Sequence, residues 1–268
     1  MEEQAGKQKG KVAFCVNCSD EYFYSMNTDK LIKSAKYFHP DIPFFVYGSA
    51  DMKELNVPLQ IMMPFIMYKL IDDYEMVVRF DADSIITGSL DEMLNATDYD
   101  LICVRNNNDD NKAGKDEPIA QFNVHAENYV NAGLVATTSK AFLEEWMDIN
   151  LSVGTMLPFV EQTTLNAIKR KYKTLIVDSK ESDVYYGVSC LYGDGSENQT
   201  HWDCWKDINV VNGGLYLNSK KIKVLHNGGG FSPDKMQLYR FNERTRKRIV
   251  EIIEGQNLER SVATDAQP

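Results

Sequence analysis

Short apolar runs alternate along this chain with segments in which apolar residues recur at helical spacing. The apolar runs predict strands at 11–17, 43–47, 59–63, 99–104, 130–137, 174–178, 210–218 and 221–226. A further strand begins at Met76 and runs into Asp81 and Asp83. The segments with helical spacing predict helices at 28–38, 64–73, 139–150 and 158–172, and a last helix that starts at Ser232. This alternation predicts an α/β fold with a mostly parallel sheet and helices on both of its faces.

The composition is that of an ordinary soluble globular protein, because 43% of the 268 residues are hydrophobic and 25% are charged. This length favours one domain, expected over 10–255, between a disordered lead at 1–9 and a disordered tail at 256–268. The net charge of −10 argues against a general binder of nucleic acid or anionic membranes. No run approaches the roughly 18 apolar residues of a membrane helix, and the polar N-terminal residues lack the apolar core of a signal peptide. We therefore expect a cytoplasmic protein.

The strand that begins at Met76 ends in two carboxylates, Asp81 and Asp83, which are two residues apart. Side chains two apart on a strand project to the same side, so both charges would point to one place. Two close carboxylates repel each other unless a cation joins them. A divalent metal held by hard oxygen ligands, with a phosphate on its far side, resolves this repulsion. Arg79 shares the strand face of Asp81 and is expected to neutralise it.

A second candidate site follows His226, which ends a predicted strand and precedes three glycines and the start of a helix. Glycines let the backbone approach a ligand closely, and the first turn of a helix offers free N–H groups to an anion. Lys235, in that first turn, would add a positive charge beside a phosphate. His226 would be a third metal ligand, and imidazole beside carboxylates suits Mn²⁺ at least as well as Mg²⁺.

Three other features have simpler interpretations. Cys15 and Cys18 form a C-x-x-C pair without the second pair that zinc needs, so we expect buried thiols. Asp109 and Asp110 lie in a polar stretch and are expected to be solvated charges. The aromatic residues between 185 and 205 fit either an acceptor platform, a lid over a donor, or core packing.

Four motifs follow one another along the chain: FDADS at 80–84, VNAGL at 130–134, EQTTLN at 161–166 and LHNGGG at 225–230. In this order they resemble the GT-A fold glycosyltransferases, which use nucleotide-sugar donors. The chain is most similar to the group that contains glycogenin and bacterial lipopolysaccharide galactosyltransferases, and the resemblance spans residues 11 to about 235. It implies a GT-A (Rossmann-like) α/β fold in a single domain, with a mixed, mostly parallel sheet flanked by helices.

The resemblance implies that Asp81 and Asp83 bind the metal and the donor, with His226 as the third ligand of Mn²⁺ or Mg²⁺. Asn131 would face the sugar or the acceptor, and Gln162 would lie beside the donor sugar. The other residues that it implies at the donor are Phe14, Val16, Asn17, Lys69, Ala82, Gly228, Gly229 and Lys235. Glu161 stands where the family commonly has Asp, so its catalytic role is left open. The Gly-x-x-Lys-Pro-Trp segment of the family is absent after the histidine.

The expected activity is metal-dependent transfer of a sugar, a hexose by the resemblance, from a UDP-sugar or GDP-sugar to a glycan or another hydroxyl acceptor. UDP is favoured, and the resemblance favours retention of configuration. Two alternatives stay open. A phosphatase of the haloacid dehalogenase type also has Asp-x-Asp after an apolar strand, although Ile85 stands where it usually has Thr or Val. The other alternative is a catalytically dead module that binds nucleotide sugars.

Overall fold

The computed structural model describes residues 10–21, 28–105, 129–154, 160–177, 207–226 and 241–255, together with the short strands β8 (Val184–Tyr185) and β9 (Val188–Ser189). These parts of the chain fall into two compact units, each with a hydrophobic core of its own. The chain passes back and forth between the units, with one passage between Asp81 and Ala82. The units are therefore not successive domains along the sequence.

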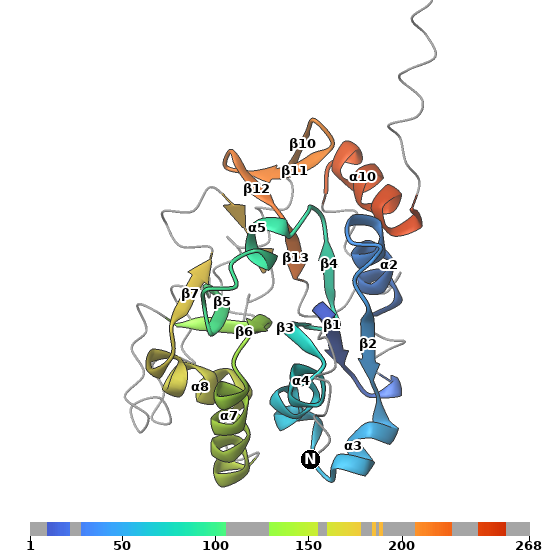
Figure 1. Ribbon diagram of the computed structural model, residues 1–268. Helices are drawn as coiled ribbons and strands as arrows, with labels where there is room; N and C mark the ends of the chain where they lie inside the picture. Colours follow the sequence, from blue (N-terminus) through green and yellow to red (C-terminus); the bar gives the residue numbers. More distant parts are fainter. Residues whose placement is uncertain are drawn as a thin grey trace, which may run out of the picture. The chain divides into compact units, whose positions relative to one another are not determined.

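The first unit is built on a six-stranded mixed sheet. Its strands, in order across the sheet, are β2 (Phe44–Tyr47), β1 (Gly10–Asn17), β3 (Tyr74–Phe80), β6 (Val130–Thr137), β5 (Leu101–Arg105) and β7 (Thr174–Val177) (Figure 1). Only β6 is antiparallel to its neighbours in this sheet, and the other pairs are parallel. The prediction of a mixed, mostly parallel sheet is confirmed. Because β6 runs in reverse, its first residues lie at the same sheet edge as the carboxyl ends of β1 and β3.

In the first unit α4 (Met63–Ile71) and α8 (Val160–Ile168) pack on this sheet, and α7 (Lys140–Val153) packs on both of these helices. The short helix α3 (Ser49–Leu55) lies against β2. In α4 the buried residues include Met63, Ile66, Met67 and Leu70, at the spacing of one helix face. The α7 helix begins where predicted, after Ser139, whose hydroxyl accepts a hydrogen bond from the backbone N–H of Phe142. The helices and the strands enclose one core.

The predicted strand at 59–63 is wrong. Leu59–Ile61 is a turn of 3-10 helix, and α4 begins directly after it at Met63. A short apolar run fits a strand and a buried helix equally well by periodicity. Pro64 in the first turn of α4 is the residue that favours the helix, because proline suits the start of a helix.

The second unit contains two small sheets, with strands in the orders β4-β13-β9 and β10-β11-β12-β8. Their bounds are β4 (Ser84–Ile86), β13 (Val224–His226), β10 (Asn209–Val211), β11 (Gly214–Leu217) and β12 (Lys220–Ile222). Two helices, α2 (Thr28–Phe38) and α10 (Glu243–Glu254), pack against each other in this unit. Its core includes Ile85, Leu215, Leu225 and Ile249.

Two predicted strands of the second unit are each broken in two. The predicted strand at 210–218 is a hairpin, because Asn212 and Gly213 have φ angles of 47° and 74° and turn the chain. Asn-Gly is the typical sequence of a two-residue hairpin turn with both φ angles positive. The predicted strand at 221–226 divides at Lys223 into β12 and β13, which belong to different sheets. The predicted helix start at Ser232 lies outside the described residues; α10 begins at Glu243, after the N-cap Asn242.

Two expectations from composition can also be compared with the structure. Cys15, Cys18 and Cys103 are buried free thiols, which confirms the interpretation of the C-x-x-C pair as core cysteines. Among the helices that the structure describes, none has the length and apolar character needed to cross a membrane.

Candidate functional site

Asp81 and Asp83 lie in the turn between β3 and β4 and not on one continuous strand. Asp81 follows the last residue of β3, and its backbone N–H donates a hydrogen bond of 2.7 Å to the carbonyl of Gly133 in β6. Asp83 precedes β4 and its side chain is only 11% exposed, whereas the side chain of Asp81 is 31% exposed. Ala82 between them is half-buried. The turn therefore holds one carboxylate inside the protein and leaves the other partly accessible.

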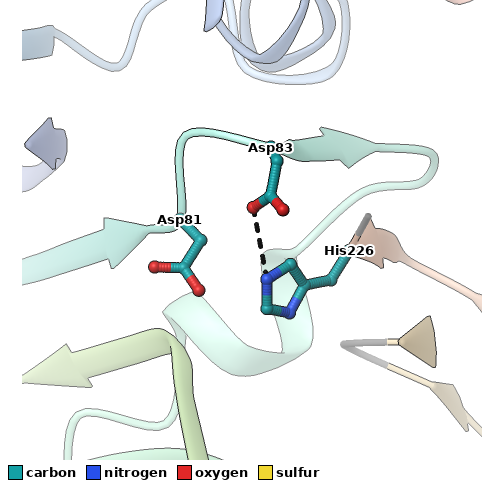
Figure 2. A group of neighbouring side chains, drawn as sticks. All are labelled: Asp81, Asp83 and His226. Carbon is teal, nitrogen blue, oxygen red and sulfur yellow. Dashed lines mark ion pairs between the residues drawn. The ribbon is translucent and has the colours of Figure 1, made fainter. Parts of the chain in front are cut away.

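His226 is brought to Asp83 by the register of two strands. The β4 and β13 strands pair antiparallel with Ser84 opposite His226, so the residue before Ser84 lies next to the histidine. The Nε2 atom of His226 is 3.2 Å from Oδ1 of Asp83, and His226 is 8% exposed. Figure 2 shows the Asp83 carboxylate turned toward the imidazole of His226, with the Asp81 carboxylate beside them. One ligand atom from each of Asp81, Asp83 and His226 lies within 4.8 Å of the others.

This donor set fits a divalent cation. Two ligands on neighbouring positions of an octahedral ion are about 3 Å apart when the metal–ligand distances are about 2.1 Å. The separation of 3.2 Å between His226 and Asp83 is close to that value. Two carboxylates with one imidazole suit Mn²⁺ or Mg²⁺ better than a soft metal, which prefers thiolates. The three predicted metal ligands are therefore brought together as expected.

Arg79, in β3, lies beside Asp81 and is 4% exposed. Its Nη1 donates hydrogen bonds to Oδ1 of Asp81 and, at 3.1 Å, to the carbonyl of Ala132. Its Nε donates to Oδ1 of Asn17 at 2.9 Å. Burial lowers the pKa of Arg79, but the carboxylates of Asp81 and Glu161 raise it more, so the pKa lies above its usual value and the guanidinium is charged. The sequence interpretation of Arg79 as a neutralising charge holds, but its bonds to β1 and β6 were not foreseen.

Glu161 lies in the first turn of α8 and stabilises the start of α4. The residue as a whole is partly exposed, but its carboxyl group lies inside the protein and accepts a hydrogen bond of 2.9 Å from the N–H of Met63. Burial raises the pKa of Glu161 to about 8, against the opposing effects of Arg79 and of the Met63 N–H group. A neutral acid is therefore the main form of Glu161 at pH 7.

Gln162 and Asn131 each accept a hydrogen bond from the backbone near the start of β6. The Oε1 atom of Gln162 accepts a hydrogen bond of 3.1 Å from the N–H of Ala132, and the Oδ1 atom of Asn131 accepts one of 2.6 Å from the N–H of Gly133. Asn166, one turn further along α8, bonds to both the N–H and the carbonyl of Val130. The hydrogen bonds of these amides hold the first residues of β6 at the edge of the sheet where Asp81 lies. Asn166 was not foreseen as part of this arrangement, although it lies in the same sequence motif.

The predicted donor residues of β1 have unequal access to this edge. Asn17 is the last residue of β1 and is bonded to Arg79. Phe14 and Val16 are fully buried in the sheet, and the ring of Phe14 packs edge-on against Phe80, with 5.2 Å between centroids. Asn17 is therefore linked to Asp81 by the hydrogen bonds that Arg79 donates to both, whereas Phe14 and Val16 lie in the core.

Lys69 is not brought to the aspartates. It lies in the last turn of α4, just before β3 begins, and forms an ion pair of 2.9 Å with Glu54. The β3 strand has seven residues, so at 3.3 Å per residue the start of β3 is about 23 Å from Asp81. Arg79 is the buried cation that contacts Asp81. The other predicted contacts, Gly228, Gly229 and Lys235, lie outside the described residues.

No protein-family model matches the chain, and no curated protein matches its sequence. Solved structures do match its fold. The bifunctional glycosyltransferase WbbM, in its apo form, has a TM-score of 0.59 at 12% identity, over 92% of this chain and 50% of its own. The galactosyltransferase LgtC, in complex with donor and acceptor sugar analogs, has a TM-score of 0.52 at 13% identity, over 90% of this chain and 95% of its own.

The glycosyltransferase GlyE of Streptococcus pneumoniae gives a TM-score of 0.53 at 17% identity, over 92% of this chain and 60% of its own. The chain has the fold of these glycosyltransferases. The GT-A fold expected from the four motifs is thereby confirmed. The chain spans about half the length of WbbM and nearly all of LgtC. At these identities the likeness concerns the fold, and the chemistry has to be argued from the residues of this chain.

Proposed function

We propose that this chain is a metal-dependent glycosyltransferase that moves a sugar from a nucleoside-diphosphate sugar to a glycan or another hydroxyl acceptor. The observation that carries the proposal is the convergence of Asp81, Asp83 and His226 within a fold shared with glycosyltransferases. LgtC, one of those proteins, was crystallised with analogs of its donor and acceptor sugars. A UDP-sugar donor, Mn²⁺ as the ion, retention of configuration and a cytoplasmic location are part of the proposal.

The reaction makes one main electrostatic demand on the site. As the bond from the sugar to the diphosphate breaks, the leaving diphosphate gains negative charge. A divalent ion, when bound, supplies Lewis-acid stabilisation of that charge. Asp81, Asp83 and His226 would hold the ion, and the hydrogen bond from Arg79 fixes the orientation of the Asp81 carboxylate. In this scheme the aspartates would hold the ion that meets the leaving group, and they do not act as the acid and base of the reaction.

The sugar side of the site is assigned to the amides at the start of β6. Asn131 and Gln162 both bond to the backbone of this segment, so their positions are fixed before a substrate arrives. An LgtC variant with an active-site glutamine changed to glutamate is among the similar structures, and Gln162 is proposed as the active-site glutamine of this chain. A catalytic role for Glu161 stays a prediction. With a pKa of about 8 its carboxyl is mainly protonated at pH 7, and in that form it cannot accept the proton of an acceptor hydroxyl.

The test is a screen of UDP-sugars and GDP-sugars for release of the nucleoside diphosphate, with Mn²⁺ and a set of glycan acceptors. We expect release with one group of donors, and we expect EDTA to abolish it. Titration calorimetry with UDP and GDP, each with and without Mn²⁺, measures binding without turnover. Absence of any nucleotide binding would contradict the proposal, and binding without any transfer or hydrolysis would favour the catalytically dead module. Metal-dependent turnover of an aryl phosphate would favour the phosphatase.

A further inference from the structure

Arg79 is the buried cation beside the proposed metal ligands, and its contacts are unusual for a residue that only balances charge. It is 4% exposed, and its guanidinium bonds to three groups from three neighbouring strands of the central sheet: Asn17 in β1, Asp81 after β3, and the carbonyl of Ala132 in β6. A planar guanidinium with fixed donors holds such an arrangement better than a flexible ammonium. The Asp81 carboxylate therefore has a defined orientation before any metal arrives.

The positive charge of Arg79 also acts on any cation at this site. A divalent ion bound by Asp81 would lie near the guanidinium, and like charges repel strongly where water is excluded. Two carboxylates offset a divalent charge, but one of them is already paired with Arg79. Asp81, Asp83 and Arg79 together have a net charge of about −1, and a neutral imidazole of His226 adds none. A diphosphate would supply the missing negative charge.

We infer that Arg79 is a positioning residue that makes the divalent ion bind weakly to the protein alone and tightly together with a nucleoside diphosphate. The guanidinium orients Asp81 for the ion and at the same time opposes the ion until the diphosphate arrives. The site would then take the ion and the donor as a pair. This inference rests on the proposed function, since it takes the diphosphate of the donor as the second ligand.

The experiment measures the affinity for Mn²⁺ by electron paramagnetic resonance of the free ion, with the full chain and with or without UDP. In the wild type we expect UDP to tighten Mn²⁺ binding by about tenfold or more. In Arg79→Gln the opposing charge is gone, so we expect Mn²⁺ alone to bind about tenfold more tightly and UDP to add less than in the wild type. Arg79→Lys keeps the charge, and its UDP effect is expected within about threefold of the wild type.

The matched control is Arg170→Gln. Arg170 is exposed in a turn before β7, at the opposite edge of the same sheet, and its loss changes the net charge by the same amount. We expect no change in Mn²⁺ affinity for this variant. Circular dichroism and thermal melts establish that each variant is folded.

The outcomes separate this inference from the function on which it rests. A wild type that binds Mn²⁺ with UDP, together with a folded Arg79→Gln variant of unchanged Mn²⁺ affinity and unchanged UDP effect, would overturn the role of Arg79 alone. If Arg79→Gln does not fold, Arg79→Lys decides: tenfold tighter binding of Mn²⁺ alone in that variant contradicts the charge argument. A wild type that binds Mn²⁺ neither alone nor with UDP or GDP overturns both the inference and the proposed function.

Discussion

At the scale of single residues, Asp83 gives the most direct test of the proposed metal site. Its side chain is 11% exposed and lies 3.2 Å from His226, and Asp83→Asn preserves its shape while removing its charge. We expect this variant to lose at least about 100-fold in metal-dependent nucleotide release, because even an indirect partner of a metal is worth about 10- to 100-fold. The control is Asp148→Asn on the exposed face of α7. Equal activity in the two variants, both folded, would exclude Asp83 as a ligand.

The buried carboxyl of Glu161 predicts a pH dependence of stability. Burial raises its pKa in the folded protein to about 8, above the ordinary value of 4.5, so the folded state binds its proton more tightly than the unfolded state does. The resulting stabilisation is fully present below about pH 4.5 and is lost as the pH rises through about 8. The Glu161→Gln variant has no such proton to lose. We expect the wild type to lose up to about 1.4 kcal/mol per pH unit relative to this variant across that interval, measured by urea unfolding with EDTA present. A constant difference between pH 5 and pH 8 would contradict the assignment.

At the scale of the elements, the sequence predicted the helices and strands whose boundaries are set by residues close by in the sequence. The α2 helix has the predicted bounds, and so does β6, an apolar run of eight residues. The hairpin at Asn212-Gly213 was missed although its signal is local, because the apolar residues on both sides were taken as one run.

In the candidate site, too, some features could be predicted from the sequence and others could not. The metal ligands follow from their place at strand ends, and the register of β4 with β13 joins them. Arg79 was expected to balance Asp81, but its bonds to Asn17 and Ala132 depend on the order of the strands in the sheet. Lys69 was expected at the donor from sequence position alone, and the length of β3 separates it from Asp81. Contacts between strands that are distant in sequence were the part that could not be predicted.

The missed hairpin makes a prediction of its own. Gly213 has a φ of 74°, a left-handed conformation that costs other residues roughly 1–2 kcal/mol. A Cβ at this position would meet only the end of the Arg248 side chain, at 3.9 Å, so Gly213→Ala strains the backbone without a clash. We expect its free energy of unfolding to fall by about 1 kcal/mol. Asn212→Gly, at a φ of 47°, is the control and should change stability by less than about 0.5 kcal/mol. A Gly213→Ala variant as stable as the wild type would contradict the turn.

At the scale of the whole molecule, a ligand that binds only the folded chain raises its unfolding temperature. If Mn²⁺ and a nucleoside diphosphate bind as a pair, the two together should stabilise the chain far more than either does alone. At a concentration of 100 times the dissociation constant the gain is about 2.7 kcal/mol, which corresponds to a rise of about 5–10 °C for a chain of this size.

Thermal melts of the full chain with Mn²⁺, with UDP, and with both measure this effect, and EDTA should reverse it. The Asp83→Asn variant should lose most of the combined shift, because its ion lacks one of the three ligands. The Arg79→Gln variant should instead gain part of the shift from Mn²⁺ alone, since the charge that opposes the free ion is absent. Equal shifts from Mn²⁺ alone in the wild type and in Arg79→Gln would mean that the guanidinium does not control metal binding.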